Sequence, residues 1–586
     1  MWDTEADLRA IRRAWRPRLF EVYEAALRDD PAEFDRLYGL AWDRQDANGL
    51  IAVASVLRAQ GKLGVKAERR FAGALLTIGD FDAALELLER PAQASDSPDH
   101  LFRLGQGLAG VGRFEEARAA LARATTSWPD HRDLAAFAQR VDAALDAGTR
   151  LEASPGWAER RSFVDACMAV GARAPAARAL LAVLDVPPFA VAEAVENVEA
   201  IGAWALELLG PKRARPFLKT LSGAFPQSSP LKALAASCRL RLGEAPAVLN
   251  EARNADWAGS GDRDLGLAYA EACEAAGERE AAVSALGAMS LHHARDEDIR
   301  NALASTIGRL VLDKVAPRFG PPADKPRIFN LVPFNDEVTM IKIRLREMAD
   351  WVDKFVIVEG AMTFTGAPKP LRFQALRGEL AEFESKLLYV PVETFPDYVD
   401  APWSRDFYQR DMAISALSGL WSPEDLVLLT DADEIVNRAV LDGVTAPVVP
   451  LRMWTHRYFL NYRAETGTKR SDYWTGVIGK ARHLSEYGCS YTRFVLGRAS
   501  LEWGRILGAG WHFTSINDAA GIARKFASFA HQEVNKRKLQ DEGYMKGVLD
   551  RIRAGELEDE WERSAIDDSF PLYVREHQDE LKDLIL

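Results

Sequence analysis

The chain has 586 residues, of which 48% are hydrophobic and 27% are charged, and its formal net charge is -12. This length exceeds that of one ordinary domain, and the composition is that of a globular protein with an ample core. The negative charge argues against nucleic-acid binding, which needs a basic surface. It still allows a small phosphorylated ligand, which needs only a few local cations.

The four cysteines are scattered and none has CxxC spacing, so neither a disulfide framework nor a zinc cluster is expected. The first residues are polar and acidic, unlike the start of a signal peptide, and no run of 18 apolar residues occurs. We therefore expect a cytoplasmic protein without a membrane span. The Ala- and Arg-rich composition suggests a bacterial protein.

The first part of the chain, residues 1–313, has a helical pattern with regularly spaced glycines. Gly79 and Gly112 lie 33 residues apart and begin similar phrases, GDFDAA and GRFEEA. Later glycines repeat the interval: Gly210, Gly243 and Gly277 are spaced 33 and 34 residues apart. Glycine permits the left-handed turn between paired helices, and this period resembles the tetratricopeptide (TPR) repeat. We expect an all-α, TPR-like solenoid that is degenerate between residues 140 and 210; the alternative is an irregular helical domain.

The pattern changes after a proline-rich linker at residues 314–326, where a helix cannot continue. Beyond the linker, short apolar runs alternate with helical patterns. The predicted strands are 327–333, 354–359, 387–392 and 425–430, and the predicted helices are 338–348 and 406–420. This alternation predicts a mostly parallel α/β sheet in a second domain, residues 327–586.

Three carboxylates, Asp431, Asp433 and Glu434, follow the fourth predicted strand. Ligands of open parallel sheets bind beyond the carboxyl ends of the strands. Clustered acids repel one another, and a divalent cation between them and a diphosphate would explain their placement. The alternatives are a solvated acidic turn and a kinase- or hydrolase-type Mg²⁺ site, although no P-loop is present. His512, after a turn at Gly510, is a candidate third metal ligand beside Asp431 and Asp433, although a lone histidine is more often structural.

The segments after the first two predicted strands mix glycine, small polar and aromatic residues, which suits a nucleotide base and ribose. The candidate donor-binding residues are Pro333, Asn335, Glu337, Glu359, Arg410, Asp431, Lys525 and His531. Two of these have structural alternatives: Arg410 could pair with an acid across its helix, and His531 could be a buried structural histidine.

If such a site transfers a group from a nucleotide diphosphate to a hydroxyl, it also needs a general base that takes the hydroxyl proton. The candidates are Glu434, Asp472 and Glu359, and the sequence does not rank them. Asp472 lies in a polar loop that an acceptor could reach, but a solvated loop acid would have the same pattern.

The second domain resembles glycosyltransferase family 17. The matching phrases, in order, are PFNDE (333–337), IRL (343–345), VDKFVIVE (352–359), TFTGAPKPL (363–371), DADEI (431–435), GWHF (510–513) and SFAHQE (528–533). The resemblance implies a GT-A-like fold, a nucleotide-diphosphate sugar donor, a divalent metal (Mn²⁺ or Mg²⁺) and inversion at the anomeric carbon. It implies a hexosyl- or N-acetylhexosaminyl-transferase. The helical half is not part of this family's pattern.

Together these patterns predict an inverting, metal-dependent glycosyltransferase whose helical repeats recruit a protein or glycan acceptor. One alternative is a non-catalytic TPR scaffold that carries a decayed transferase fold. Another retains the enzyme but makes the solenoid an oligomerisation device.

Overall fold

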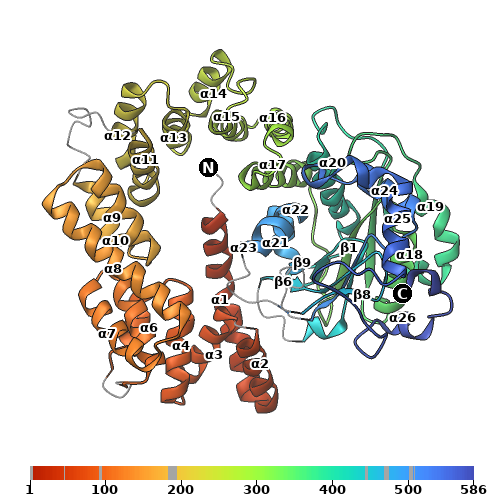
Figure 1. Ribbon diagram of the computed structural model, residues 1–586, viewed down its shortest axis with the longest axis horizontal. Helices are drawn as coiled ribbons and strands as arrows, with labels where there is room; N and C mark the ends of the chain where they lie inside the picture. The colour runs from red at the N-terminus through yellow and green to blue at the C-terminus, as the bar shows by residue number, and fades with distance from the viewer. Residues whose placement is uncertain are drawn as a thin grey trace. The chain divides into compact units, whose positions relative to one another are not determined.

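The computed structural model describes residues 4–44, 46–90, 95–182, 195–442, 447–466, 474–499, 506 and 508–586 (Figure 1). The chain forms two compact units, each described here by itself. The first is Arg16–Glu278, and the second joins Arg279–Leu586 with the first part of helix α1, up to Trp15. Helices α16 (Arg279–His292) and α17 (Glu297–Val315) thus belong to the second unit. The domain bounds that we predict, 1–313, 314–326 and 327–586, stay a prediction.

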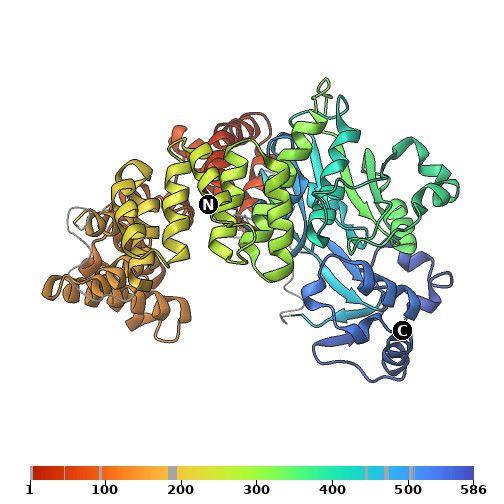
Figure 2. The same cartoon turned by 90° about the horizontal axis from the view of Figure 1, so that it is seen from above.

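In the described part of the first unit, every regular element is a helix, drawn in red to yellow in Figures 1 and 2. The helices are α1 (Thr4–Asp29), α2 (Pro31–Asp43), α3 (Ala47–Ala59), α4 (Val65–Thr77), α5 (Phe81–Leu88), α6 (Pro98–Gly110), α7 (Phe114–Ser127), α8 (Arg132–Ala153), α9 (Trp157–Ala169), α10 (Arg173–Leu181), α11 (Val195–Leu209), α12 (Pro211–Ala224), α13 (Ser229–Leu240), α14 (Ala245–Asn254) and α15 (Arg263–Ala275). Most consecutive helices pack against each other, as expected for helical hairpins.

The predicted turn glycines end the first helix of successive pairs. Gly79, Gly112, Gly243 and Gly277 have φ between 75° and 87°. After each of them, the next residue donates its N–H to the carbonyl five positions back, as when Asp80 bonds to Leu75 at 2.9 Å. This is the Schellman cap, which needs a left-handed residue. The TPR-like helical repeat is therefore confirmed, and Gly171 (φ 81°) continues it into the stretch that the sequence marks as degenerate.

Close packing of these hairpins gives a testable stability effect at Gly110, the last residue of α6. A Cβ atom at Gly110 would lie 2.3 Å from the ring of Phe81 on α5. Gly110→Ala must displace this ring, and we expect it to lower the free energy of unfolding by about 1–3 kcal/mol. Thermal unfolding measures the effect.

The control is Gly223→Ala on α12, where no atom lies within 4 Å of the added Cβ. Alanine there should be neutral or stabilising, because it favours the helix and restricts the unfolded chain. Equal melting temperatures for the two variants would contradict the packing described for α5 and α6.

The second unit contains a six-stranded sheet in the order β3-β2-β1-β4-β9-β6. The strands are β1 (Ile328–Phe334), β2 (Lys354–Gly360), β3 (Leu387–Val392), β4 (Leu426–Leu429), β6 (Val448–Arg452) and β9 (Trp474–Lys480). Strands β1 to β4 are parallel, which confirms the four predicted strands, and β9 runs antiparallel to β4 and β6. The carboxyl ends of β1, β2 and β4 therefore meet at one edge of the sheet.

A second sheet of five strands, in the order β11-β8-β7-β10-β5, continues from the first. It comprises β5 (Glu434–Val436), β7 (Trp454–Arg457), β8 (Tyr462–Ala464), β10 (Gly510–Thr514) and β11 (Trp561–Arg563). The helices that position the site are α18 (Val338–Met348), α20 (Pro402–Met412), α21 (Ala481–Tyr487), α22 (Cys489–Tyr491) and α24 (Ala519–Ser528). The predicted helix 406–420 begins earlier, at Pro402, and becomes a 3₁₀ helix at Ala413–Leu417.

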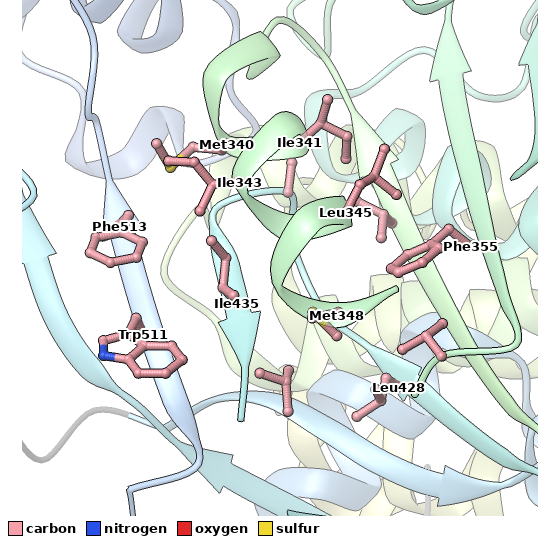
Figure 3. Close-up of a cluster of buried hydrophobic side chains, with 14 of the residues drawn as sticks. Met340, Ile341, Ile343, Leu345, Met348, Phe355, Leu428, Ile435, Trp511 and Phe513 are labelled. Atoms are coloured by element: carbon pink, nitrogen blue, oxygen red, sulfur yellow. The ribbon is translucent and has the colours of Figure 1, made fainter. Parts of the chain in front are cut away.

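Helix α18 contributes to a core that both sheets share. The apolar face of α18, with Met340, Ile343 and Leu345, belongs to one buried cluster with Ile435 of β5 and Trp511 of β10. Figure 3 shows Ile435 between α18 and the strand that carries Trp511. Because β5 and β10 are packed in this way, the segment between β4 and β5 is held between two sheets. Among the described residues, no helix combines the length and apolarity needed to cross a bilayer.

Candidate active site

The acidic loop, residues 431–434, joins β4 to β5 at the carboxyl edge of the parallel sheet. Asp431 Oδ1 accepts a hydrogen bond from Arg410 Nη1 at 2.7 Å, and its Oδ2 accepts one from Arg493 Nη2 at 2.9 Å. Glu434 accepts two bonds from Arg493, at 2.8 and 2.9 Å. Although burial opposes ionisation, Arg493 and Arg410 hold the pKa of Asp431 well below its ordinary value. Two buried arginines thus occupy the carboxylates on either side of Asp433.

A third arginine, Arg344 of α18, is fully buried beneath the same loop. Its guanidinium donates to the side chains of Asn330 at 2.6 Å and Thr430 at 2.9 Å, and to the backbone oxygens of Asp431 and Glu434. These bonds fix the path of the loop backbone. Arg344 occurs in the phrase IRL but is not among the predicted site residues; an arginine on the otherwise apolar face of a helix is the signal that could have identified it.

Asp433 has a different environment from its neighbours. Its Oδ2 accepts a hydrogen bond from Lys525 Nζ of α24 at 2.7 Å. Its Oδ1 faces His512 Nε2 of β10 across 3.9 Å, which is too long for a hydrogen bond. Burial opposes ionisation of Asp433, but Lys525 and then His512 lower its pKa. A bond from Phe513 N to the Asp433 backbone oxygen, at 2.8 Å, holds the loop against β10.

These two residues suit a divalent cation. A carboxylate oxygen and an imidazole nitrogen are donors that Mn²⁺ accepts, and their 3.9 Å gap has no hydrogen bond across it. Among the described residues, no three His, Cys, Asp or Glu side chains converge on one point. The predicted set of Asp431, Asp433 and His512 is thus present as the pair Asp433 and His512, while both oxygens of Asp431 are bound to arginines.

A cavity of about 440 Å³ extends from Asp433 along the ends of β1 and β2. Its polar lining comprises Asn335, Asp336, Glu337, Thr339, Thr363, Thr365, Lys369, Arg372, Asp433, Ser515, Asn517, Arg524, Lys525 and Ser528. Of the predicted donor-binding residues, Asn335, Glu337 and Lys525 line this cavity. Pro333, Glu359, Arg410, Asp431 and His531 are not among its lining residues. A volume of this size, with four cations on its wall, can hold a nucleotide diphosphate.

Glu359, predicted as a base or a nucleotide ligand, is fully buried behind the cavity wall. Its carboxylate accepts bonds from the backbone N–H of Arg372 at 2.7 Å and of Phe373 at 3.0 Å. It also accepts bonds from Lys369 Nζ at 3.1 Å and the Tyr389 hydroxyl at 2.9 Å. Four donors saturate this carboxylate, so its geometry is that of a residue that positions the segment carrying Lys369 and Arg372.

The remaining predicted residues are Glu337, Asp472 and His531. Glu337 accepts bonds from the backbone N–H of Asn335 and Asp336, and burial raises its pKa against the opposing effect of Lys525. Asp472 lies outside the described residues, so its predicted role stays a prediction. His531 follows α24 and bonds to Glu533.

A buried acid, Asp411, connects the helix that carries Arg410 to the segment that precedes Arg493. It follows Arg410 on α20 and accepts backbone bonds from Cys489 and Ser490 at the start of α22. The next segment is the π-helix Thr492–Leu496, which carries Arg493. Burial raises the pKa of Asp411 to about 7, although these donors act in the opposite direction.

The raised pKa of Asp411 predicts a pH-dependent stability. The folded-state pKa of Asp411 lies above its unfolded value of about 4, so the folded state favours the protonated carboxyl. The resulting stabilisation is complete below pH 4 and is lost as pH rises through 7. Asp411→Asn cannot ionise, so its free energy of unfolding relative to the wild type should rise by roughly 2–3 kcal/mol between pH 5 and pH 8. Urea unfolding at these pH values measures it, with exposed Asp579→Asn as the control. A difference that does not change with pH would contradict the prediction.

Comparisons with known proteins agree with this description. A sequence model of glycosyltransferase family 17 matches residues 319–538. The β-1,4-mannosyl-glycoprotein 4-β-N-acetylglucosaminyltransferases of Rattus norvegicus and Homo sapiens are each 33% identical over 132 residues, which is 21% of this chain and 24% of the relative. The chain therefore matches about a quarter of these relatives' length. Both relatives are animal proteins, so a bacterial source stays a prediction.

Two solved structures also overlap with the chain. The P58(IPK) TPR domain has a TM-score of 0.21 at 16% identity, over 48% of this chain and 80% of that one. Naa15/Naa10 bound to HypK has a TM-score of 0.20 at 16% identity, over 52% and 47%. The helical description above rests on this chain's own helices and turns. The segment matched by the family 17 model, residues 319–538, contains all of the phrases read from the sequence.

Proposed function

We propose that this protein is an inverting glycosyltransferase that moves an N-acetylhexosamine from a nucleotide-diphosphate donor to a hydroxyl of a protein or glycan acceptor. The family match and the activity named for the relatives support the reaction class. The observation that carries the proposal is the pair of Asp433 and Lys525 on the lining of the 440 Å³ cavity, with His512 facing Asp433 across 3.9 Å. The parallel order β3-β2-β1-β4, with β9 antiparallel, supports a GT-A-like description.

The donor would lie along the cavity with its diphosphate near Asp433. Lys525 and Arg524 of α24, with Lys369 and Arg372 from the segment after β2, place positive charge on the lining of the cavity, where a diphosphate needs it. Burial lowers the pKa of Lys525, but Asp433 outweighs this effect and keeps the ammonium charged. A protonated Lys525 can bond to the departing diphosphate and stabilise the negative charge that develops there.

A divalent cation would be held by Asp433 and His512, and it would supply further positive charge to the leaving group. Asp431 and Glu434 are fixed by Arg493 and so set the position of Asp433 rather than bind the cation. The metal requirement and the inversion of configuration are parts of this proposal.

The helical unit would recruit the acceptor, because stacked helical hairpins present extended surfaces to protein ligands. The alternative role, self-association of the repeats, predicts a change in oligomeric mass and not in acceptor choice when the repeats are altered. A cytoplasmic location stays a prediction of the amino-acid composition.

Nucleotide binding tests the proposal. Thermal unfolding of the full chain is followed with a panel of nucleoside diphosphates, with and without Mn²⁺. A ligand that binds only the folded state raises the melting temperature, by an amount that corresponds to about 2.7 kcal/mol at 100 times Kd. We expect a Mn²⁺-dependent rise with one nucleoside diphosphate. If no nucleotide raises the melting temperature, the non-catalytic scaffold is the better description.

A further inference from the structure

The segment SFAHQE, residues 528–533, begins at the last residue of helix α24 and continues beyond it. In it, His531 Nδ1 lies 2.7 Å from Glu533 Oε1. The Glu533 side chain is 7% exposed and the His531 side chain 47%, so a nearly buried carboxylate holds one nitrogen of an accessible imidazole. Burial opposes ionisation of Glu533, but the bond from His531 lowers its pKa, so it stays an anion.

The imidazole is also held in orientation. The ring of Trp403 on α20 meets it edge to face, with centroids 4.5 Å apart and an interplanar angle of 80°. With Nδ1 turned to Glu533, the free nitrogen is Nε2, for which no hydrogen bond is found among the described contacts. This arrangement of a carboxylate, an imidazole and a free Nε2 is that of an oriented general base.

The dyad of His531 and Glu533 follows α24, whose last residue, Ser528, lines the cavity, and its imidazole packs against Trp403 of α20. α20 carries Trp403, and also Asp406 and Arg410, which form the ion pair behind Asp431. Burial raises the pKa of Asp406, and Arg410 and His531 are among the groups that oppose this rise, which places the imidazole close to that pair. α24 carries Lys525, which bonds to Asp433. The dyad is thus attached to both elements that hold the acidic loop.

We propose that His531 is the general base of the transfer reaction and that Glu533 is the residue that positions it; the proposal rests on the proposed function. Nε2 of neutral His531 accepts the proton of the acceptor hydroxyl while that oxygen forms its bond to the anomeric carbon of the donor. The bond from this carbon to the diphosphate oxygen breaks, and its electron pair leaves with the nucleoside diphosphate. The proton stays on His531 as an imidazolium paired with Glu533 and is then released to solvent.

Of the three acids predicted as bases, Asp472 lies outside the described residues, and the other two are already bound. Both oxygens of Glu434 accept bonds from Arg493, at 2.8 and 2.9 Å. Glu359 is saturated by four donors. Neither carboxylate can take up a proton without breaking buried hydrogen bonds.

Arg300, which precedes the segment 319–538 that the family model matches, also contacts Glu533. Arg300 of α17 lies with Nη1 3.5 Å from Glu533 Oε1, and its guanidinium stacks 5.3 Å from the centre of the Trp403 ring. Helix α17 precedes residues 319–538, so the matched segment receives a positioning residue from the preceding helices.

Turnover without an identified acceptor tests the role of His531. The full chain is incubated with Mn²⁺ and UDP-N-acetylglucosamine, UDP-glucose or GDP-mannose, and release of the nucleoside diphosphate to water is measured. For the active donor, His531→Asn should lower kcat by about 10²–10⁴-fold with KM changed less than about threefold. Imidazole in solution should partly rescue His531→Ala.

The control is His577→Asn, since the His577 imidazole stacks on the Tyr573 ring and bonds to the Tyr573 backbone on α26 (Leu572–Glu576) and does not line the cavity. Its kcat should equal that of the wild type. A His531→Asn enzyme that folds and turns over within threefold of the wild type would overturn the proposal. If the wild type releases nothing from any donor, the proposed function itself fails, and this is seen before any variant is compared.

The pH profile separates a catalytic imidazole from a structural one. The charged groups that face His531 are Glu533, Arg300 of α17 and Asp406 of α20. Only neutral imidazole is active, so kcat falls on the acid side. Glu533→Gln removes a negative charge and should move this limb to lower pH by about one unit. Arg300→Met removes a positive charge and should move it to higher pH. Shifts in the same direction, or none, would contradict the assignment.

Discussion

Asp433→Asn is expected to abolish the Mn²⁺-dependent rise in melting temperature and to lower donor turnover by about 10³-fold. The physical reason is the position of this carboxylate. Asp433 is the one acid of the loop with an oxygen that faces His512 instead of an arginine, and its other oxygen bonds to Lys525. Asparagine keeps the shape but removes the charge that a cation requires. It also leaves Lys525 without its counter-ion.

The matched control is Asp442→Asn, an exposed acid on the segment that follows β5. It should leave both the nucleotide-dependent rise and the turnover unchanged. A full Mn²⁺-dependent rise in the Asp433 variant would place the cation elsewhere, and the account of the acidic loop would then be wrong.

Arg493→Met is expected to lower the free energy of unfolding by about 3–5 kcal/mol, because removing one partner of a buried ion pair leaves uncompensated charges. The Arg493 side chain is 4% exposed, and its guanidinium bonds to Asp431, Glu434 and the backbone oxygen of Leu429. Methionine fills part of the volume but offers no donors. Urea unfolding measures the loss, and nucleotide binding should weaken as well, because Asp431 and Glu434 no longer hold the loop.

Arg498→Met is the matched control on α23 (Gly497–Ala499), which directly follows the π-helix of Arg493. Arg498 pairs with Glu297 at 2.5 Å, but its side chain is 54% exposed. Exposed ion pairs contribute about 0–1 kcal/mol, so this variant should unfold nearly as the wild type does. Equal effects of the two substitutions would show that the buried network does not stabilise the loop.

The features that could be predicted from the sequence are those with a local cause. A glycine is needed wherever a helix ends in a left-handed turn, so the 33-residue interval of Gly79 and Gly112 gives the helical hairpins directly. Four apolar runs give β1 to β4 because buried parallel strands need continuous hydrophobic side chains. The acidic loop follows the fourth run, and its position at the sheet edge follows from topology alone.

What could not be predicted depends on contacts between distant segments. Arg493 lies 62 positions after Asp431, on a π-helix that no periodicity indicates, yet its two bonds decide that Asp431 faces an arginine. The donors to Glu359 include the backbone N–H of Arg372 and the hydroxyl of Tyr389 on β3. An acid at a strand end has the same sequence pattern whether it binds such donors or a nucleotide. Arg300 precedes every strand of the six-stranded sheet in sequence, whereas Glu533 follows them, so their contact cannot be read from the sequence.

The most direct test of the central claim is release of a nucleoside diphosphate by the purified full chain from a panel of nucleotide sugars, with and without Mn²⁺. The account predicts Mn²⁺-dependent release from one donor by the wild type, and loss of this release in Asp433→Asn. Absence of release from every donor, in a protein that is folded by its thermal unfolding curve, would contradict it and leave the helical repeats as the functional part of the chain.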